Sequence, residues 1–158
     1  SYCQDNEISW IDWSLLEKNQ DLFEFFKFMI DYRKKHPVIR KKLDNAVCGM
    51  EAMHAHDVNA ERMEVPQNAK TLAVSFAGYD RKKGKDDLVY VAVNSYWEEV
   101  KITLPNLANH GAWYLSVDTY GDEKGKYFYK EGEEIRIDRE YVMKPRSIVV
   151  FTGREILR

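Results

Sequence analysis

The opening segment of the sequence carries two carboxylates at a spacing that suits acid and base chemistry. Asp5 and Glu7 are two residues apart, so in an extended chain both side chains project to the same side. Two carboxylates can act as general acid and base, but such a pair flanks the reacting bond and usually comes from different structural elements. The alternatives are the acid/base pair of a small hydrolase and an acidic loop, solvated or at the rim of a cleft, and the sequence favours the loop.

A second group of residues offers ligands for a metal ion. His54 and His56 would share one side of an extended segment, and Asp57 follows them. A catalytic zinc site needs three protein ligands and a structural site usually four, and no Cys-x-x-Cys or His-Glu-x-x-His motif accompanies these histidines. We therefore expect surface or packing histidines, no metal site and, since no Gly-x-Gly-x-x-Gly spacing precedes a helix, no cofactor.

The two cysteines and four of the aromatic residues are the remaining candidates for chemistry. Cys3 or Cys48 would need a positioned histidine to act as a nucleophile, which the spacing does not show. Two cysteines in a chain of this size do not make a disulfide framework, so we expect two thiols and a reducing compartment. Sugar rings stack on exposed aromatic rings, which draws attention to Trp10, Trp13, Tyr96 and Trp97. For the pair at 96 and 97, after a predicted strand, the alternatives are a carbohydrate stacking platform and a sandwich corner or interdomain contact; the sequence favours the latter.

Length and composition exclude several classes of protein. The chain has 158 residues, too few for a complete eight-fold α/β barrel of about 250 residues. With 44% apolar residues and a net charge of −2, it has material for a core and no basic surplus for nucleic acid. No run approaches the roughly 18 apolar residues of a spanning helix, and there is no signal-peptide pattern, so we expect a soluble protein with no membrane partner. Because it opens on Ser1, we expect a removed initiator or a start inside a longer sequence.

A helix apolar around most of its circumference is expected over about residues 20–36. Between residues 22 and 32 the only polar residues are Glu24, Lys27 and Asp31, which form one stripe at helical spacing. Asp21 suits the start, cations before Pro37 suit the end, and residues 14–17 add a short turn with capping-box spacing. Since an ordinary surface helix has one apolar stripe, this helix needs packing partners on two sides.

From about residue 70 the pattern changes to that of strands. Alternation predicts strands with one buried face at 72–76, 100–104 and 113–117, while continuous apolar runs at 88–93 and 148–151 predict strands covered on both faces. Residues 135–137 offer a further strand, and residues 44–68 are read as a connection with one strand near Met53. The lysines at 82, 83 and 85, flanked by Asp80, Asp86 and Asp87, predict a solvated hairpin loop. The fold class is mainly β, an antiparallel β-sandwich preceded by a long amphipathic helix.

Several long, irregular motifs carry a family resemblance. They are the run at 2–13 (YCQDNEISWIDW), Asp21-Leu22 and the run at 32–40 (YRKKHPVIR), followed by 70–74, 93–98, 104–105, 113–118 and 145–147. This sequence resembles the isoamylase and glycogen-debranching, pullulanase-like branch of the α-amylase superfamily, glycoside hydrolase family 13. The resemblance is strong over 1–40, moderate over 70–151 and poor over 44–68.

The resemblance implies a division of the chain and a parent activity. Residues 1–43 would be the last loop and helix of a catalytic (β/α)8 barrel, and residues 44–158 the C-terminal β-sandwich of the α-amylase type. The implied parent hydrolyses α-1,6 branch linkages of glycogen or starch-like glucans with retention through a glycosyl-enzyme intermediate. Its catalytic carboxylates would lie before Ser1, so we expect no catalytic residue here and no activity of this piece alone. Asp5, Asn6 and Glu7 would line the rim of the glucan cleft, because barrel active sites lie at the C-terminal face.

The implied partners are the missing catalytic barrel and an α-glucan, and the implied location is the cytoplasm. Without the barrel, Phe23, Phe26 and Ile30 would lose their cover, at roughly 1.5–3 kcal/mol for each fully exposed side chain. We expect the piece to hide this face by self-association or by folding the helix back over the sandwich. The alternative function is a free-standing carbohydrate-binding sandwich using Tyr96 and Trp97.

Overall fold

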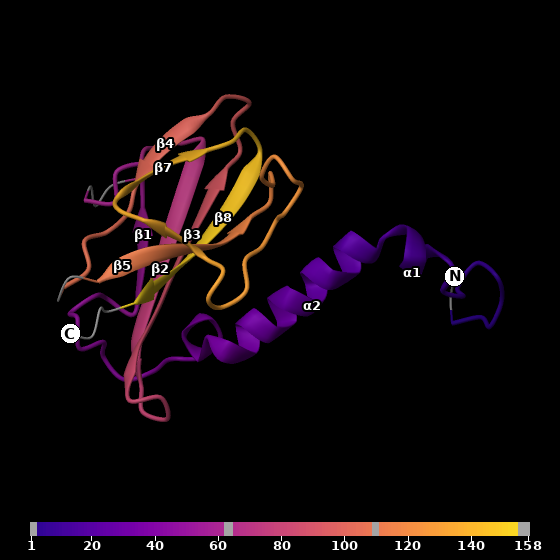
Figure 1. Ribbon diagram of the computed structural model, residues 1–158, viewed down its shortest axis with the longest axis horizontal. Helices are drawn as coiled ribbons and strands as arrows, with labels where there is room; N and C mark the ends of the chain where they lie inside the picture. The colour runs from indigo at the N-terminus through magenta and orange to yellow at the C-terminus, as the bar shows by residue number, and fades with distance from the viewer. Residues whose placement is uncertain (1–2, 62–64, 109–110, 155–158) are drawn as a thin grey trace.

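The computed structural model describes residues 3–61, 65–108 and 111–154. They form a β-sandwich from which a helical arm projects (Figure 1). The helices are α1 (Leu15–Lys18), α2 (Gln20–Lys35) and the short 3-10 helix η1 (Pro37–Ile39). The strands are β1 (Met53–His56), β2 (Thr71–Asp80), β3 (Lys85–Asn94), β4 (Val100–Thr103), β5 (Ala112–Asp118), β6 (Ile135–Ile137), β7 (Glu140–Met143) and β8 (Ser147–Arg154).

Two antiparallel sheets make up the sandwich, which confirms the predicted fold class. The larger sheet has the order β1-β2-β3-β8-β5-β6, and the smaller one pairs β4 with β7. The predicted strands are present, including the one near Met53, but β7 was not predicted. Its four residues, EYVM, form a run too short for its periodicity to be recognised, and the strand gains its place by pairing with β4.

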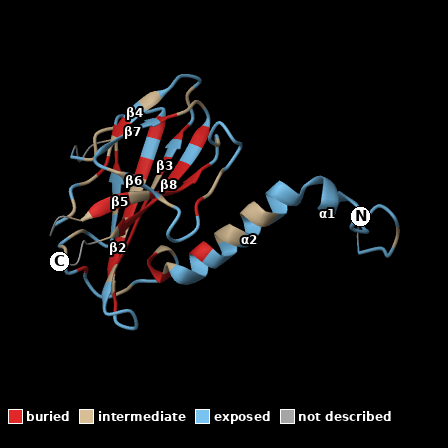
Figure 2. Ribbon diagram, viewed as in Figure 1, coloured by how far each residue is buried: buried red, intermediate tan, exposed pale blue. Residues whose placement is uncertain are grey.

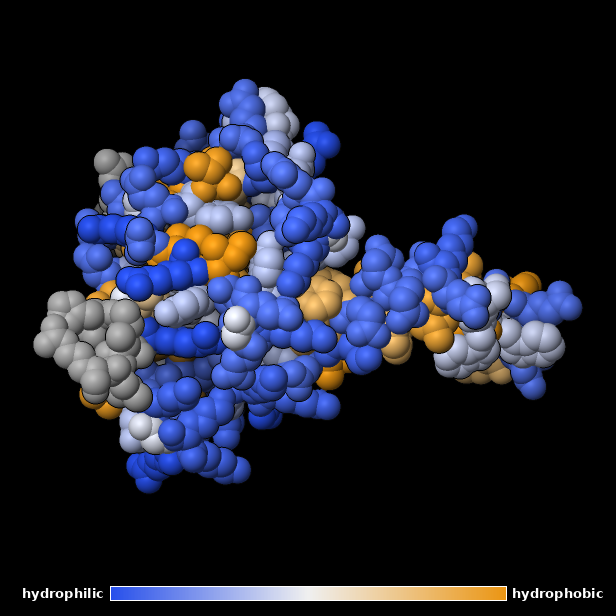
Figure 3. All heavy atoms as spheres, in the orientation of Figure 1, coloured by the Kyte–Doolittle hydropathy of each residue, from blue (hydrophilic) through white to orange (hydrophobic). Residues whose placement is uncertain are grey.

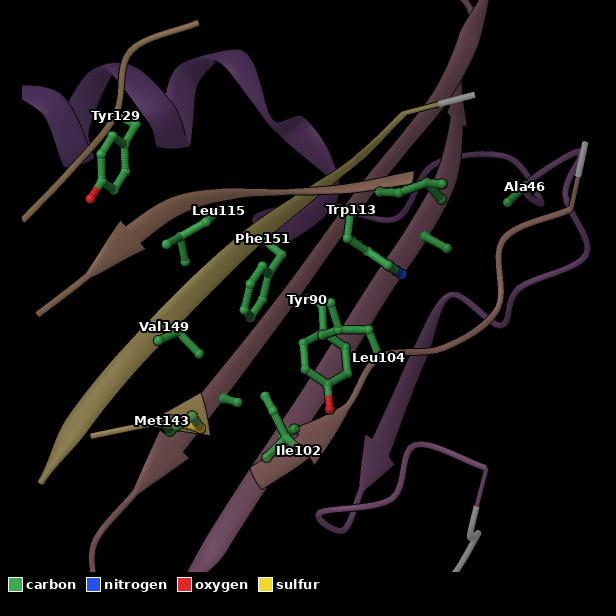
Figure 4. Packing of buried hydrophobic residues seen from close by; sticks show 14 residues of the cluster. Ala46, Tyr90, Ile102, Leu104, Trp113, Leu115, Tyr129, Met143, Val149 and Phe151 are labelled. Carbon is green, nitrogen blue, oxygen red and sulfur yellow. The ribbon is translucent and has the colours of Figure 1, made fainter. Parts of the chain in front are cut away.

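The main core lies between the two sheets, on what we call the inner face of the larger sheet. Tyr90, Trp113 and Phe151 fill this space together with side chains of β4 and β7 (Figure 4). Ala73 and Ala77 of β2 point into the same cluster, where small side chains complement the large rings.

The prediction of which face of β2 is buried is wrong. The alternation of apolar and small residues in β2 suggested that its large apolar residues face the core. Instead Ala73 and Ser75 are buried on the inner face, and Leu72 on the opposite, outer face is 46% exposed. The larger side chain turns outward because the inner positions of this strand lie against large aromatic rings.

A β-bulge in β5 corrects a second expectation. The residues Trp113, Leu115 and Val117 were expected to share a face. The pairing with β8 shifts between Leu115, opposite Phe151, and Val117, opposite Val150. A one-residue shift moves the following side chains to the other face of a sheet, so Val117 lies in the outer cluster.

The C-terminal half of helix α2 packs on the outer face of the larger sheet. The sequence predicted such a packing partner for one of the two apolar sides of the helix. Tyr32 is buried there with Val89 and Val150, and Phe28 stacks on Phe128 with 4.5 Å between ring centroids. The hydroxyls of Tyr32 and Thr152 are hydrogen-bonded at 2.8 Å. These contacts fix the C-terminal half of the helix, whereas α1 and most of α2 remain exposed (Figure 2).

The bounds of α2 agree with the prediction, but the predicted capping box before α1 is wrong. Helix α2 runs from Gln20 to Lys35, and the backbone N–H of His36 closes it by donating to the carbonyl of Tyr32. Ser14 makes no side-chain cap; its hydroxyl donates to Asp12 at 2.6 Å, and its backbone N–H donates to the same carboxylate oxygen at 3.0 Å. Asp12 therefore stabilises this turn, since one of its carboxylate oxygens accepts both bonds from Ser14.

The acidic residues near the β2–β3 hairpin also differ from their prediction. Asp86 and Asp87 were expected to flank a solvated loop, but β3 begins at Lys85, so both lie in the strand. Asp86 accepts the backbone N–H groups of Val47 and Cys48 at 2.9 and 2.8 Å. Asp87 accepts the backbone N–H of Val38 at 3.1 Å, so both carboxylates bind the segment that connects the helix to the sandwich. The lysine-bearing turn is solvated as predicted.

Candidate functional site

The predicted rim residues lie in a loop at the free end of the helical arm. The loop surrounds an open hollow of about 430 Å³ lined by Asp5, Asn6, Glu7, Ile8 and Trp10. The indole N–H of Trp10 donates to Asp5 at 2.6 Å, and the side-chain oxygen of Asn6 accepts the backbone N–H of Ile8 at 3.1 Å. These bonds shape the loop and leave its acidic edge exposed to solvent.

This loop is far from the other candidate residues. Helix α2 has 16 residues and therefore spans about 24 Å between the loop and the sandwich. The loop lies beyond the N-terminal end of that helix (Figure 1). The structure thus does not bring the loop at residues 5–7, before α1, together with the turn at residues 96–97, which follows β3 in the sandwich.

Tyr96 and Trp97 lie beside one another in the turn after β3. Their ring centroids are 4.2 Å apart and their planes are tilted by 40°. The ammonium group of Lys70 lies 3.8 Å from the centroid of the Tyr96 ring and 5.3 Å from that of Trp97. A cation over an aromatic face is attracted by the ring quadrupole, so Lys70 occupies one face of Tyr96 while Trp97 stays exposed.

A buried asparagine, which the sequence analysis did not single out, holds this turn. The amide of Asn94 donates to the carbonyls of Glu98 and Lys144 at 2.9 and 3.0 Å. Its side-chain oxygen accepts the backbone N–H of Tyr96 at 3.0 Å. The position of an Asn at the end of a strand was the available signal, because Asn readily bonds to backbone two residues on.

The two histidines of β1 are packing residues, as the sequence favoured. The imidazole of His56 is hydrogen-bonded to the Ser75 hydroxyl at 2.8 Å and to the Ala60 carbonyl at 3.0 Å, and burial lowers its pKa. His54 is hydrogen-bonded to Glu51 at 3.0 Å. Within the described residues, no group of three or more His, Cys, Asp or Glu side chains is placed to hold a metal ion.

A large groove lies between the polar stripe of α2 and the sandwich. This groove has a volume of about 1140 Å³, and its walls come from α2, the β2–β3 hairpin, residues 128–134 and the end of β8. Its ionic residues carry both signs, namely Glu24, Lys27, Asp31, Lys34, Lys35, Lys83, Lys85, Asp86, Asp87, Lys130, Glu131, Glu134 and Arg154. Such a mixture selects neither anions nor cations.

Hydroxyl groups at the wall of this groove are poor candidates for catalysis. The Thr152 hydroxyl is hydrogen-bonded to those of Tyr32 and Ser116, each at 2.8 Å. Burial raises the pKa of Tyr32 well above its usual value, so the phenol keeps its proton. A hydroxyl nucleophile needs a base beside it, and these hydroxyls are bonded to one another.

The other apolar side of α2 is uncovered, which bears directly on the sequence prediction. Phe23, Phe26 and Ile30 are 43%, 59% and 54% exposed, and Leu22 is exposed beside them. We call these four residues the apolar flank; hydrophobic surface is visible along the arm in Figure 3. The expectation that the helix folds back to hide this side is wrong, because only Phe25, Phe28, Met29 and Tyr32 of the helix pack on the sandwich. Among the described residues no helix is long and apolar enough to cross a membrane.

Comparison with known proteins identifies the sandwich. The model of the family "Isoamylase, C-terminal" matches residues 47–152, well over half of the chain. A glycogen operon protein GlgX homolog of Mycobacterium tuberculosis (strain ATCC 25618 / H37Rv) is 51% identical over 41 residues, which are 26% of this chain and 6% of that protein. The chloroplastic isoamylase 3 of Oryza sativa subsp. japonica is 28% identical over 120 residues, and the isoamylase of Pseudomonas amyloderamosa 24% over 119 residues.

These matches cover a much larger share of this chain than of the related proteins. Both isoamylase matches cover 75% of this chain, but only 14% and 15% of those proteins. The chain therefore spans a small part of the length of the curated relatives that it matches. Because the family model covers the strands from β1 to β7 and most of β8, the chain belongs to the isoamylase C-terminal domain family.

Proposed function

We propose that the chain is the C-terminal part of a glycoside hydrolase that cleaves α-1,6 branch linkages of glycogen or starch-like glucans. Its family membership and the names of its relatives, which are isoamylases and glycogen operon proteins, support this substrate class. In this proposal residues 1–43 are the last loop and helix of the catalytic barrel, and residues 44–158 are the sandwich that braces the helix. We place the parent enzyme in the cytoplasm.

The observation that carries the proposal is the uncovered apolar flank of α2. The flank includes two phenylalanines and an isoleucine that are each about half exposed on a helix whose opposite side is firmly packed. Covering a large apolar side chain fully contributes roughly 1.5–3 kcal/mol. A final barrel helix has barrel strands on one side and the appended sandwich on the other, which matches these two apolar sides.

The loop at the end of the arm would meet the substrate in this arrangement. Loops after barrel strands build the active-site face of such enzymes. The carboxylates of Asp5 and Glu7 and the amide of Asn6 can hydrogen-bond to sugar hydroxyls. Because Asp5 is bonded to Trp10 within the loop, we assign it a role in binding rather than in proton transfer. The nucleophile and the acid would come from the preceding part of the parent, so the isolated chain is expected to be inactive.

The decisive experiment compares the full-length parent enzyme with the isolated 158-residue chain. Release of linear chains from a branched glucan is measured by the appearance of reducing ends. We expect activity of the parent and none of the isolated chain. In the parent, Asp5→Asn should raise KM by about two- to tenfold with little change of kcat, since it weakens one ground-state hydrogen bond. Asp138→Asn, at an exposed site on the sandwich, is the matched control.

Two results would contradict the proposal. One is cleavage of α-1,6 linkages by the isolated chain that is lost in Asp5→Asn, because it would make this chain a small hydrolase. The other is a parent polypeptide with no debranching activity on any branched α-glucan.

Tyr96 and Trp97 remain candidates for stacking on a sugar ring, with Trp97 as the accessible member of the pair.

A further inference from the structure

Two short stretches of the chain carry a strong excess of positive charge. Residues 40–42 (RKK) and 81–85 (RKKGK) contain seven of the 24 lysines and arginines and no acidic residue. All 26 Asp and Glu residues lie elsewhere, so the rest of the chain is distinctly acidic. The net charge of −2 therefore combines two regions of opposite sign, and a clustered positive region suits an anionic ligand.

The fold brings the two stretches together at one corner of the sandwich. Residues 40–42 follow η1, and residues 81–85 form the turn between β2 and β3 with the first residue of β3. Asp44 makes an antiparallel bridge with Tyr79, so the residues just before Asp44 run beside those just after Tyr79. The segment after η1 crosses the hairpin at this end of the sandwich (Figure 1). We call the seven exposed cationic residues the basic corner, namely Arg40, Lys41, Lys42, Arg81, Lys82, Lys83 and Lys85.

The acidic side chains near the basic corner are bonded within the fold. Asp86 and Asp87 accept the backbone N–H groups of residues 38, 47 and 48. Asp80 is 7% exposed and accepts the backbone N–H of residue 82 at 3.0 Å. Asp44 pairs with the guanidinium of Arg81. In the described part of the chain, the side chains of the corner that make neither an ion pair nor a hydrogen bond are those of Arg40, Lys41, Lys42, Lys82 and Lys85.

We propose that the basic corner binds phosphate monoesters carried by the branched glucan. This inference rests on the proposed function, because it takes the glucan as the polymer that reaches the corner. A phosphate monoester is a compact, strongly charged anion near neutral pH, and lysine ammonium groups bind phosphate as point charges. Unmodified stretches of a glucan are neutral, so the corner would distinguish phosphate-bearing chains from chains without phosphate.

The distribution of charge favours a sparsely charged polymer over a uniformly charged one. A duplex nucleic acid or an anionic membrane presents negative charge along its whole surface. Such a surface also meets the acidic remainder of this chain, which repels it. Neither basic stretch contains an aromatic residue on which a base would stack, or a large apolar residue that would enter a bilayer. An isolated phosphate group meets only the corner.

The basic corner and the loop of Asp5 lie at opposite ends of α2. The corner adjoins the C-terminal end of this helix, because the ammonium group of Lys83 donates to the carbonyl of Lys35. The loop precedes the N-terminal end, and the helix between them spans about 24 Å. Only a polymer can occupy both places at once, and binding at one place raises its effective concentration at the other. The corner would therefore lower KM for phosphate-bearing polymers and leave kcat unchanged.

The test measures debranching by the full-length parent enzyme on two forms of one branched glucan. One form carries phosphate monoesters, and the other is the same polymer after a phosphatase has removed them. At low ionic strength we expect a KM about three- to tenfold lower for the phosphate-bearing form, with equal kcat. The triple variant Lys41→Gln/Lys42→Gln/Lys82→Gln should abolish this preference without changing KM for the other form. High salt should abolish it too, because salt screens exposed charges.

The matched control removes the same charge elsewhere on the sandwich. Lys101→Gln/Lys124→Gln/Lys126→Gln replaces three exposed lysines outside the corner, so it should keep the preference. Inorganic phosphate, added at the concentration of the glucan-bound ester, should also leave the preference in place, since a free ion lacks the second contact that the polymer makes. Loss of the preference at that concentration would mean that the corner binds free phosphate, which overturns the inference.

The remaining outcomes separate the inference from its rivals and from the proposed function. Equal KM values of the unmodified parent for the two forms, or loss of the preference in the control variant, overturn the inference. Binding of a DNA duplex or of phosphatidylglycerol vesicles that only the corner variant loses, without any glucan preference, gives the corner another partner and overturns it as well. Native gels containing each glucan form supply a readout independent of cleavage. A parent that the phosphate-bearing form retards more strongly, but that does not debranch, refutes the proposed function alone.

Discussion

His36, at the end of α2, is hydrogen-bonded through Nδ1 to the carboxylate of Asp87 in β3 at 2.6 Å. The second carboxylate oxygen accepts the backbone N–H of Val38 at 3.1 Å. The side chain of Asp87 is only 4% exposed. Because the two bonds join the end of the helix to an interior strand, they fix the direction in which the arm leaves the sandwich.

Replacing this carboxylate should weaken the fold measurably. We expect Asp87→Asn to lower the free energy of unfolding of the isolated chain by about 1.5–3 kcal/mol, because an amide cannot accept both bonds in place of the carboxylate. Urea unfolding followed by circular dichroism measures the change. Asp138→Asn, whose side chain is 96% exposed, should leave the midpoint unchanged. Equal midpoints for the two variants would show that the contact with His36 does not stabilise the chain.

The helix was predictable from the sequence, whereas its attachment was not. The three-and-four spacing of Glu24, Lys27 and Asp31 is a local signal, and it sufficed to place α2 and its two apolar sides. Asp87 is indistinguishable by sequence from other polar residues near a lysine-rich turn, because its partners lie about 50 positions earlier. The side-chain faces of β5 were mispredicted for a related reason, since a bulge changes the alternation without a residue type that reveals it.

The candidate site was predictable only as separate pieces. Adjacent residues such as Tyr96 and Trp97 were readily expected to lie together, and they do. Their support by Asn94 depends on the carbonyl of Lys144, 50 residues later, which no local pattern indicates. The distance between the loop of Asp5 and the sandwich follows from the straight course of α2, which helical periodicity predicts in length but not in direction.

Acidification should destabilise the chain through His56. Burial lowers the pKa of this imidazole below its ordinary value of 6.5, so the unfolded state binds the proton more readily. The contribution of His56 to the free energy of unfolding is therefore constant above the pKa that this imidazole has in the unfolded state. It falls as the pH drops below that value towards the lower pKa of the folded state. We expect the urea midpoint to decrease between about pH 7.5 and about pH 5.5, and His56→Gln to reduce this decrease.

An exposed residue without a titratable group supplies the control for this pH dependence. Val142 is 46% exposed in the smaller sheet, so Val142→Ala should retain the decrease of the urea midpoint on acidification. If His56→Gln retains the full slope too, other groups cause the loss of stability in acid.

The two sides of α2 should respond differently to truncation. Phe28 stacks on Phe128 and lies against the sandwich, so Phe28→Ala should lower the free energy of unfolding by about 1.5–3 kcal/mol. Phe26, on the uncovered flank, should change it by no more than about 0.5 kcal/mol when replaced by Ala. Urea unfolding of the isolated chain tests both. A large loss in Phe26→Ala would mean that the flank is already covered.

We expect the isolated chain to self-associate, because the apolar flank of α2 is uncovered. The exposed apolar side chains of the flank are removed from water when two flanks meet. Sedimentation velocity should give a sedimentation coefficient that rises with protein concentration, and Phe26→Asp should abolish the rise. A monodisperse monomer at all concentrations, with the flank exposed, would contradict this expectation.

Trp97 offers a direct test against a free-standing carbohydrate-binding module. Strong binding of a glucan by stacking requires accessible aromatic faces, and Lys70 already occupies one face of Tyr96. We therefore expect the isolated chain to migrate through glycogen-containing native gels with no strong retardation. Trp97→Ala should migrate as the unmodified chain does, and Trp13→Ala, at an exposed tryptophan of the arm, is the matched control. Strong retardation that is lost only in Trp97→Ala would show that the sandwich binds glucan by itself, because loss of one stacked ring would then remove the binding energy.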